Sequence, residues 1–378
     1  MTLDAWIDER ADEMAELLCE LVAVPSENPP GREREHCATV VFDALDRLGF
    51  APEWLEGPCV RGTVGDGPEV IYFHGHFDVV PAQSTEQFKP RRTGGRIVGR
   101  GTADMKGGLV SMAYGAAAAA AAGLLDGRRI VFHAVCDEET GSTDGAGRLQ
   151  AAGEIDPAAL AMLTAEPTGG VVWHAARGAI TLRVTIAGRE AHVGHVELGE
   201  NAFEHMLAIA APLAELSREL LARDSMLVVG GQTGTGANFN VVPGSAWFSL
   251  DRRFNPDEDL DTEVEQLQET VQRAARERGA NVEIEVLQAQ PAGFSDPDSP
   301  AAHTLREAIG KPVAFERCPG VLDTRWYAQL GIPAFAYGGG RLDVSHGPSE
   351  FIEEAAMREC AAVYARFAGA IRSAAASI

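Results

Sequence analysis

The sequence predicts an α/β protein with a mixed sheet covered by helices, into which a separate α+β segment is inserted. Three observations support this prediction. Strand-like apolar runs alternate with helix-like runs up to about residue 175, two long amphipathic helices then lie among alternating strands, and a strand–turn–helix pattern returns from about residue 293. Alternation of strands and helices is typical of a sheet with helices packed on it. The 378 residues suffice for two domains.

The first segment begins with a helix predicted over residues 3–23, where apolar residues recur at helical spacing. The breakers at residues 26–31 end it, and a second helix is predicted over 33–48. The β-branched and aromatic runs at 70–76 and 129–135 predict strands. Between those strands come a glycine-rich stretch at 93–108 and an alanine-rich helix at 113–125.

The inserted segment has a different pattern. Strands are predicted at 179–188, 240–254 and 281–289, and long amphipathic helices at 200–224 and 257–279. This order is close to the β-α-β-β-α-β unit of ferredoxin-like domains. We therefore expect three segments along the chain, at residues 1–178, 179–292 and 293–378, of which the first and last form one α/β domain.

Composition limits the kinds of partner. The formal net charge is -23, which disfavours nucleic acid and anionic membranes. The alanine-rich run is too short to span a bilayer, and the acidic N-terminus lacks the features of a signal peptide. Six scattered cysteines form no CxxC pair, so we interpret them as reduced thiols and expect a cytoplasmic protein.

Metal-binding side chains follow the predicted strands. His76 and Asp78 end one strand, and Glu138 and Glu139 come shortly after another. Buried imidazoles and carboxylates need a compensating partner, and a divalent ion is one. The candidate ligands, two imidazoles and three carboxylates, suit zinc, while manganese and cobalt remain possible. They are His76, Asp104, Glu139, Glu166 and His346.

Three carboxylates have more specific expected roles. Asp104 lies among glycines and is the best candidate to bridge two ions. Asp78 is placed to accept the second ring N–H of His76, and Glu138 is a free carboxylate suited to a general base. Each residue also has an ordinary interpretation: a DEE run is often a solvated turn, and His346 can be a surface histidine.

The order of the motifs resembles the zinc-dependent aminoacylase and carboxypeptidase family, which includes acetylornithine deacetylase, succinyl-diaminopimelate desuccinylase and glutamate carboxypeptidase. GHFDVVP, GRGTADMKGG, DEETGS, AEPT and SHGPSEFI are similar to its five motifs, in order. The resemblance implies a dinuclear-metal hydrolase domain with an inserted ferredoxin-like lid that forms a homodimer. It places one ion on His76, Asp104 and Glu166 and the other on Asp104, Glu139 and His346.

The resemblance also implies roles outside the ligands. Glu138 is the general base, Asp78 orients His76, and His192 in GREAHVGH reaches the active site of the partner subunit to steady the oxyanion. A histidine on the surface of the lid is the alternative for His192. Four further residues match substrate-binding positions, and guanidinium groups grip carboxylates well. A structural ion pair is the alternative for any of the arginines. The four are Arg177, Asn240, Arg253 and Arg325.

Two departures from the family pattern bear on the substrate. Val321 and Leu322 replace hydroxyl residues found in desuccinylases, and Ala176 stands where many members have an arginine. Both changes argue against a dianionic acyl group. We expect hydrolysis of an N-acyl amino acid, with a dipeptidase or carboxypeptidase as the alternative. A non-catalytic relative would lack Glu138 or a ligand, and all are present.

Overall fold

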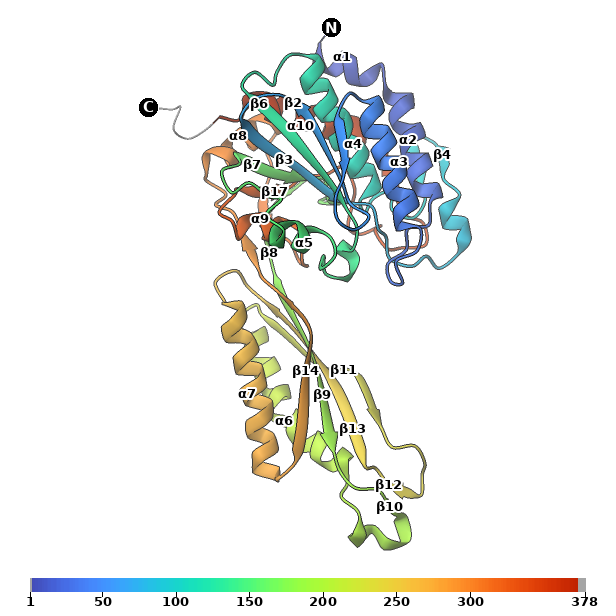
Figure 1. Ribbon diagram of the computed structural model, residues 1–378, viewed down its shortest axis with the longest axis vertical. Helices are drawn as coiled ribbons and strands as arrows, with labels where there is room; N and C mark the ends of the chain where they lie inside the picture. Colours follow the sequence, from blue (N-terminus) through green and yellow to red (C-terminus); the bar gives the residue numbers. More distant parts are fainter. Residues whose placement is uncertain (1, 373–378) are drawn as a thin grey trace. The chain divides into compact units, whose positions relative to one another are not determined.

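The computed structural model describes residues 2–372, which form two compact units (Figure 1). The first unit contains the chain up to Ala175, Gly293–Cys318 and the chain from Leu322 onward. The second unit contains Ala176–Ala292 and Pro319–Val321. Each unit has its own cluster of buried apolar side chains. The second unit is therefore built from one long insertion and a short later segment.

The first unit is built on a nine-stranded mixed sheet in the order β1-β2-β6-β3-β7-β17-β8-β15, with β16 beside β8. Its central strands β6, β3, β7 and β17 run parallel to one another. Strands β1 and β2 pair antiparallel with their neighbours, and β8 pairs antiparallel with β17 but parallel with β16. This confirms the predicted mixed α/β class. The strands are β1 (Ala51–Trp54), β2 (Val60–Gly65), β3 (Glu69–His76), β6 (Arg128–Val135), β7 (Ala161–Thr164), β8 (Val172–Ala176), β15 (Gly293–Phe294), β16 (Phe315–Arg317) and β17 (Ala334–Ala336).

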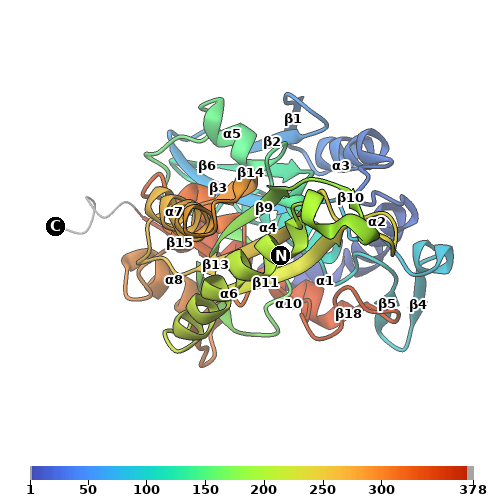
Figure 2. The same cartoon turned by 90° about the horizontal axis from the view of Figure 1, so that it is seen from below.

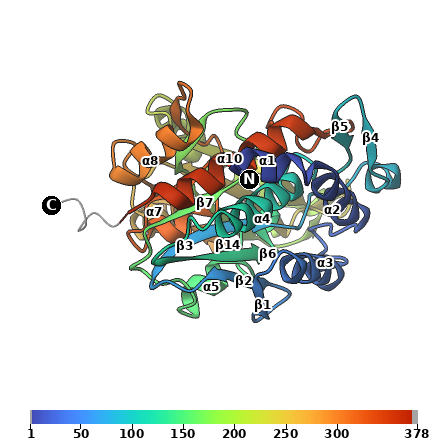
Figure 3. The same cartoon turned by 90° about the horizontal axis from the view of Figure 1, so that it is seen from above.

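Helices cover both faces of this sheet. Figure 3 shows α4 and α10 along one face and α5 on the other. A small sheet of β4 (Arg91–Thr93), β5 (Arg96–Val98) and β18 (Phe351–Glu353) lies at the side. The helices are α1 (Leu3–Asp8), α2 (Ala11–Ala23), α3 (Arg34–Arg47), α4 (Lys106–Ala121), α5 (Ala146–Ala151), α8 (Pro300–Ile309), α9 (Thr324–Ala328) and α10 (Glu354–Ala370). Short 3₁₀ turns occur at η1 (Thr85–Phe88) and η2 (Glu138–Thr140).

The predicted helix over residues 3–23 is two helices, so that prediction is wrong in its continuity. The chain turns at Arg10, whose backbone φ and ψ of -107° and 14° are not helical. The Arg10 guanidinium donates to the Trp6 carbonyl at 3.0 Å and lies over the Trp6 ring at 3.9 Å. These contacts close the end of α1, and the apolar spacing alone does not reveal them.

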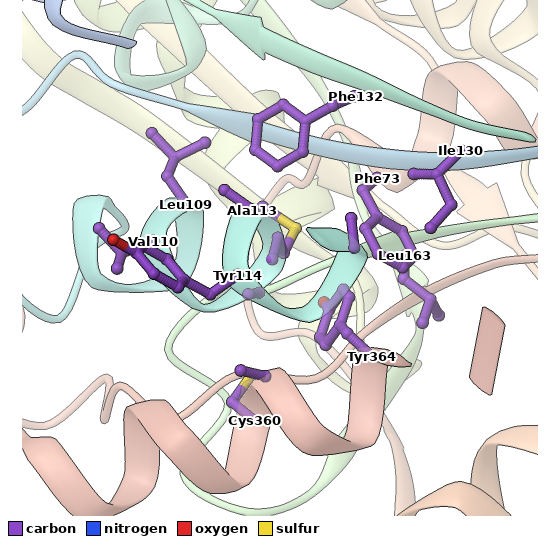
Figure 4. Close-up of a cluster of buried hydrophobic side chains, with 14 of the residues drawn as sticks. Phe73, Leu109, Val110, Ala113, Tyr114, Ile130, Phe132, Leu163, Cys360 and Tyr364 are labelled. Carbon is purple, nitrogen blue, oxygen red and sulfur yellow. The ribbon is translucent and has the colours of Figure 1, made fainter. Parts of the chain in front are cut away.

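The alanine-rich helix α4 lies between the sheet and α10. Figure 4 shows strand residues Phe73 and Phe132 on one side of α4 and α10 residues Cys360 and Tyr364 on the other. Close packing is built in, because a Cβ added at Gly115 would lie 2.6 Å from the carbonyl oxygen of Ala361. Each large apolar side chain buried in this way contributes about 1.5–3 kcal/mol. The helix is thereby fixed against the sheet that holds the candidate site.

The second unit has a four-stranded antiparallel sheet in the order β11-β13-β9-β14. Helices α6 and α7 pack together on one of its faces (Figures 1 and 2). Along the chain the order is β-α-β-β-α-β, the ferredoxin-like arrangement. The elements are β9 (Gly178–Ala187), α6 (Ala202–Leu221), β11 (Met226–Thr235), β13 (Ser245–Phe254), α7 (Leu260–Arg278) and β14 (Asn281–Gln290), with β10 (Ala191–His192), η3 (Val193–Leu198) and β12 (Val241–Val242) as smaller additions.

Strand β11 was not among the strands predicted from the sequence. It lies at the edge of the sheet, and its pairing with β13 shifts register between Val229 and Thr233. Glycines at Gly230, Gly231 and Gly234 interrupt the alternation of side chains. An irregular edge strand of this kind has little apolar periodicity to detect.

Two further findings concern composition. The six cysteines, all of which lie in described segments, are free thiols. Among residues 2–372, no helix combines the length and the apolar character needed to cross a bilayer.

Candidate metal centre and active site

The candidate site lies at the carboxyl ends of neighbouring parallel strands, the usual location for ligands in α/β sheets. Strand β3 ends at His76, while Glu138 follows the end of β6 and Glu166 follows the end of β7. The register aligns them, since Phe73 pairs with Leu163 and His76 pairs with Val135. The sheet itself therefore brings these side chains to one edge.

Asp104 comes from the loop before α4, and glycine allows this loop to approach the sheet. A Cβ added at Gly108 would lie 2.2 Å from the carbonyl oxygen of Ala165, the residue before Glu166. Only a residue without a side chain permits that approach. The start of α4 is thus pressed against the end of β7, which brings Asp104 to His76 and Glu166.

The structure gathers the five predicted ligands into two groups that share Asp104: His76 with Asp104 and Glu166, and Asp104 with Glu139 and His346. His76 Nε2 lies 3.3 Å from Asp104 Oδ1 and 3.8 Å from Glu166 Oε1. His346 Nε2 lies 3.3 Å from Asp104 Oδ2 and 3.3 Å from Glu139 Oε1. The two oxygens of Asp104 therefore face different histidines.

These spacings fit metal ions. A tetrahedral ion with ligand bonds of about 2.0–2.1 Å separates its ligand atoms by roughly 3.3–3.4 Å. In addition, His76 Nε2 and Glu166 Oε1 are buried and have no hydrogen-bond partner among the residues that the structure describes. Unpaired buried polar atoms are costly, and an ion between them would satisfy both. The donor set and the geometry thus suit a divalent ion in each group.

Burial and neighbouring charges shift the pKa values of the candidate ligands. Burial raises the pKa of Glu166 and Glu139 above their usual range. Burial would also raise that of Asp104, but the adjacent imidazoles of His346 and His76 hold its pKa below the ordinary value. The carboxylates of Asp104 and Glu139 raise the pKa of His346 to about 10. Such strong coupling is typical of functional sites.

Asp78 connects the two strand ends in a way that differs in detail from the expectation. His76 Nδ1 lies 3.0 Å from the backbone carbonyl oxygen of Asp78 and 3.4 Å from its carboxylate. The carboxylate accepts from the backbone N–H groups of Glu138 and Glu139, at 3.3 and 3.2 Å, and from the Asn28 amide at 3.0 Å. Asp78 thus orients His76 mainly through its carbonyl and holds the turn of Glu138 through its side chain.

Glu138 lies beside the first ligand group without belonging to it. Its Oε2 is 4.0 Å from His76 Nε2. Burial raises the pKa of Glu138 well above its usual range, with Glu166 adding to the effect and His76 opposing it. A carboxylate held near the ligands but outside both groups is placed to accept a proton.

A buried polar chain behind this turn was not found from the sequence. Ser142 Oγ donates to one oxygen of Asp323, and His74 Nε2 lies 2.9 Å from the other. Tyr327 Oη then joins His74 Nδ1 at 3.0 Å and His133 Nδ1 at 2.9 Å. If every N–H finds an acceptor, protons point from His133 through Tyr327 and His74 to Asp323. Burial lowers the pKa of His133 well below its ordinary value, which agrees with a neutral ring.

The predicted substrate-binding residues have varied surroundings. Arg177 is buried in the second unit, where its guanidinium pairs with Asp224 at 3.0 Å and donates to Asn255. Arg253 pairs with Asp251 at 2.7 Å. Arg325 is buried in the first unit, 3.4 Å from Asp323, and donates to the Gly141 carbonyl at 3.2 Å. These contacts give each arginine a structural role, and substrate binding stays a prediction.

The remaining two predicted residues are in the second unit and are exposed. Asn240 accepts from the backbone N–H of Val193 through its own carbonyl. His192 Nδ1 accepts from the Gly194 N–H at 3.1 Å. In the neutral ring, this contact leaves the proton on Nε2 of His192, which makes that nitrogen a donor.

Sequence reasoning also missed Asn28 and Ser142. The Asn28 amide donates to Asp78, Asp137 and Thr140. These partners lie far away in the sequence, so no local pattern links them. The sequence shows only that Asn28 lies in the polar segment SENPPG, where an asparagine is normally interpreted as a turn residue.

Comparisons with known proteins agree with this geometry. The model of peptidase family M20/M25/M40 matches residues 72–370. The succinyl-diaminopimelate desuccinylase of Corynebacterium glutamicum is 26% identical over 357 residues, covering 92% of this chain and 94% of that protein. A family match of this extent covers all five candidate ligands.

Solved structures share the fold. The M20 family metallo-carboxypeptidase Sso-CP2 from Sulfolobus solfataricus has a TM-score of 0.78 at 16% identity, covering 94% of this chain and 98% of that chain. The YXEP protein of Bacillus subtilis, a dinuclear metal binding peptidase, has a TM-score of 0.73 at 17% identity, covering 96% and 98%. The resemblance drawn from the motifs is confirmed, and the chain belongs to peptidase family M20/M25/M40.

Proposed function

We propose that this protein hydrolyses the amide bond of an N-acyl amino acid with two divalent ions, zinc first among the candidates and cobalt or manganese as alternatives. The observation that carries the proposal is the pair of ligand groups that share Asp104, with Glu138 beside them. Membership of a peptidase family supports amide hydrolysis. The name of the Corynebacterium glutamicum relative, a desuccinylase, supports the N-acyl class.

Each site residue of the first unit has a proposed role. His76, Asp104 and Glu166 hold one ion, and Asp104, Glu139 and His346 hold the other. Bound ions of this kind act as Lewis acids and lower the pKa of water. Glu138 takes a proton from the attacking water at its carboxylate and gives it to the nitrogen of the leaving amine. Asp78 keeps His76 and the turn of Glu138 in place.

The second unit is proposed to complete the site as a lid. In a homodimer formed through this unit, His192 of one protomer donates from Nε2 to the developing oxyanion in its partner. One or more of four residues hold the substrate carboxylate: Arg177, Asn240, Arg253 and Arg325. The substrate is a small molecule or short peptide, and we propose a cytoplasmic location.

The acyl group is proposed to be uncharged. Val321 and Leu322 are apolar, and Leu322 is buried. We propose that these side chains lie beside the acyl group, where apolar surroundings disfavour a second carboxylate on the substrate. We therefore expect an N-acetyl or longer aliphatic N-acyl substrate to be preferred. The N-succinyl class, which the name of the relative indicates, is the alternative to compare with it.

The test is a substrate panel on zinc-, cobalt- or manganese-loaded protein. It compares N-formyl, N-acetyl, N-succinyl and longer N-acyl amino acids with dipeptides, and adds Glu138→Gln. Loss of the general base should lower kcat by about 10²–10⁴-fold for the preferred substrate. Glu86→Gln, which changes an exposed glutamate, should keep full activity.

The outcomes separate the candidates. Preferred turnover of one N-acyl class, lost in Glu138→Gln, supports the deacylase. Preference for dipeptides moves the protein to the dipeptidase or carboxypeptidase alternative with the same catalytic residues. Turnover that survives in Glu138→Gln would contradict the assignment of the base.

A further inference from the structure

Arg100 and Glu350 form an ion pair deep in the first unit. Arg100 Nη1 lies 2.7 Å from Glu350 Oε2, and the side chains are 1% and 0% exposed. Breaking a buried pair of this kind is costly, because the remaining charge has no solvent. Neither residue belongs to the ligand groups or to the proposed proton transfer. The pair therefore calls for another role.

Glu350 holds the backbone of the loop that contains Asp104. Its Oε1 accepts from three backbone N–H groups: those of Gly101 at 3.0 Å, Ala103 at 3.0 Å and Asp104 at 3.1 Å. A carboxylate that accepts several backbone N–H groups fixes the path of the chain around it. The backbone of the shared ligand is thus set by a residue 246 positions later in the sequence.

Arg100 holds the backbone of the loop that contains His346. Its guanidinium donates to the carbonyl of His346 at 3.1 Å and reaches that of Gly347 at 3.5 Å. Gln83 donates to the same His346 carbonyl at 3.2 Å.

That loop needs support at His346. Its φ is 61°, in the left-handed region that non-glycine residues rarely adopt. Strained positions of this kind persist only where surrounding contacts determine them. The contacts from Arg100 and Gln83 to the His346 carbonyl are such contacts.

We propose that the Arg100–Glu350 pair is a positioning device for the second ion, held by Asp104, Glu139 and His346. Through one oxygen of Glu350 it fixes the Asp104 loop, and through Arg100 it fixes the His346 loop. It thereby sets the distance between Asp104 Oδ2 and His346 Nε2, 3.3 Å in the structure. This inference rests on the proposed two-ion function.

The effect should be selective for that ion. In the first group, His76 and Glu166 are held by β3 and β7 of the sheet, and only Asp104 depends on Glu350. In the second group, both Asp104 and His346 depend on the pair. Loss of the pair should therefore weaken binding at the second group much more than at the first.

The experiment is a calorimetric titration of zinc into metal-free protein, with the bound zinc counted by elemental analysis. The variants are Arg100→Lys, which keeps the charge but loses the forked guanidinium, and Glu350→Gln, which keeps the shape. Residues that orient metal ligands typically change affinity by about 10–100-fold. In both variants we expect the zinc affinity of the first ligand group to stay near that of the wild type and that of the second group to fall by about 10–100-fold.

Two controls assign the effect. Glu353→Gln breaks the exposed Arg96–Glu353 pair, three residues from Glu350, and should leave both affinities unchanged. His346→Ala should remove binding at the second ligand group. If the pair acts through His346, adding Arg100→Lys to this variant should cause no further change in zinc affinity. Circular dichroism checks folding, and if Glu350→Gln does not fold, Arg100→Lys provides the same test.

Each result decides the inference. Unchanged affinities in Arg100→Lys, or equal weakening of both sites, would overturn the positioning role while leaving the proposed function intact. A wild-type protein that binds none of zinc, cobalt and manganese would instead overturn the proposed function itself.

Discussion

Asp104 is the residue on which both ligand groups depend, because each of its oxygens faces a different histidine. The two oxygens of one carboxylate can each bind one ion of a pair that lies roughly 3.5–4 Å apart. No other described residue belongs to both groups. A substitution here should therefore affect both groups, whereas one at His346 should affect only the second.

Asp323 is the charged end of the buried chain that includes His74, Tyr327 and His133. Burial acts to raise its pKa, but the hydrogen bond from His74 lowers it from 3.8 to about 2. A carboxylate with a depressed pKa stabilises the folded state above its unfolded pKa, and this contribution is lost as the pH falls through the folded pKa. The relevant window for Asp323 thus runs from pH 3.8 down to about 2.

Asp323→Asn should lower the free energy of unfolding near neutral pH by about 1–3 kcal/mol, because a buried acceptor for Ser142 and His74 is changed. The difference from the wild type should be smaller at about pH 3 than at about pH 5, since at pH 3 the wild type has lost part of this contribution. Urea unfolding at both pH values measures this. Asp126→Asn, at an exposed position, is the control. A difference that stays constant with pH would contradict the lowered pKa of Asp323.

At the scale of the elements, the strand ends made the ligands predictable. His76, Glu139 and Glu166 each follow an apolar run, and such runs are legible as strands. Their meeting at one edge follows from parallel pairing. The order of motifs supplied the rest of the ligand set, including His346, which comes from a loop with no strand-like pattern of its own.

Other features depend on contacts between distant parts of the chain and could not be predicted. Glu350 lies in a quoted motif, yet its partner Arg100 and the loop of Asp104 are some 250 residues earlier. The turn between α1 and α2 at Arg10 and the irregular edge strand β11 likewise interrupt patterns that propensity treats as continuous. Periodicity locates elements, whereas these details are fixed by tertiary contacts.

Gly108 at the start of α4 tests whether the approach of this helix to β7 matters. Alanine normally favours a helix over glycine by about 1 kcal/mol. Here the added Cβ would lie 2.2 Å from the Ala165 carbonyl oxygen, so the backbone must shift. We expect Gly108→Ala to lower the free energy of unfolding of the metal-free protein by about 1–3 kcal/mol, measured by urea unfolding.

The matched control is Gly320→Ala, since a Cβ there meets nothing within 4 Å. It should leave the stability nearly unchanged. If Gly108→Ala proved as stable as the wild type, the close packing of α4 against β7 would not hold.

At the scale of the whole molecule, the predicted functional residues are distributed over both units. All five candidate ligands and Glu138 belong to the first unit, while His192 and three of the four predicted substrate-binding residues belong to the second. Each unit has its own core. Ion binding is therefore a property expected of the first unit, and changes at exposed positions of the second should leave it intact.

The central claim is that two divalent ions share Asp104. The most direct test counts the zinc ions bound per chain by elemental analysis after dialysis, in the wild type, Asp104→Asn, His346→Ala and His195→Ala. His195→Ala removes an exposed imidazole outside both groups. We predict two ions in the wild type and in His195→Ala, one in His346→Ala, and fewer than one in Asp104→Asn. Two ions retained in Asp104→Asn, or fewer than two in the wild type, would contradict the account.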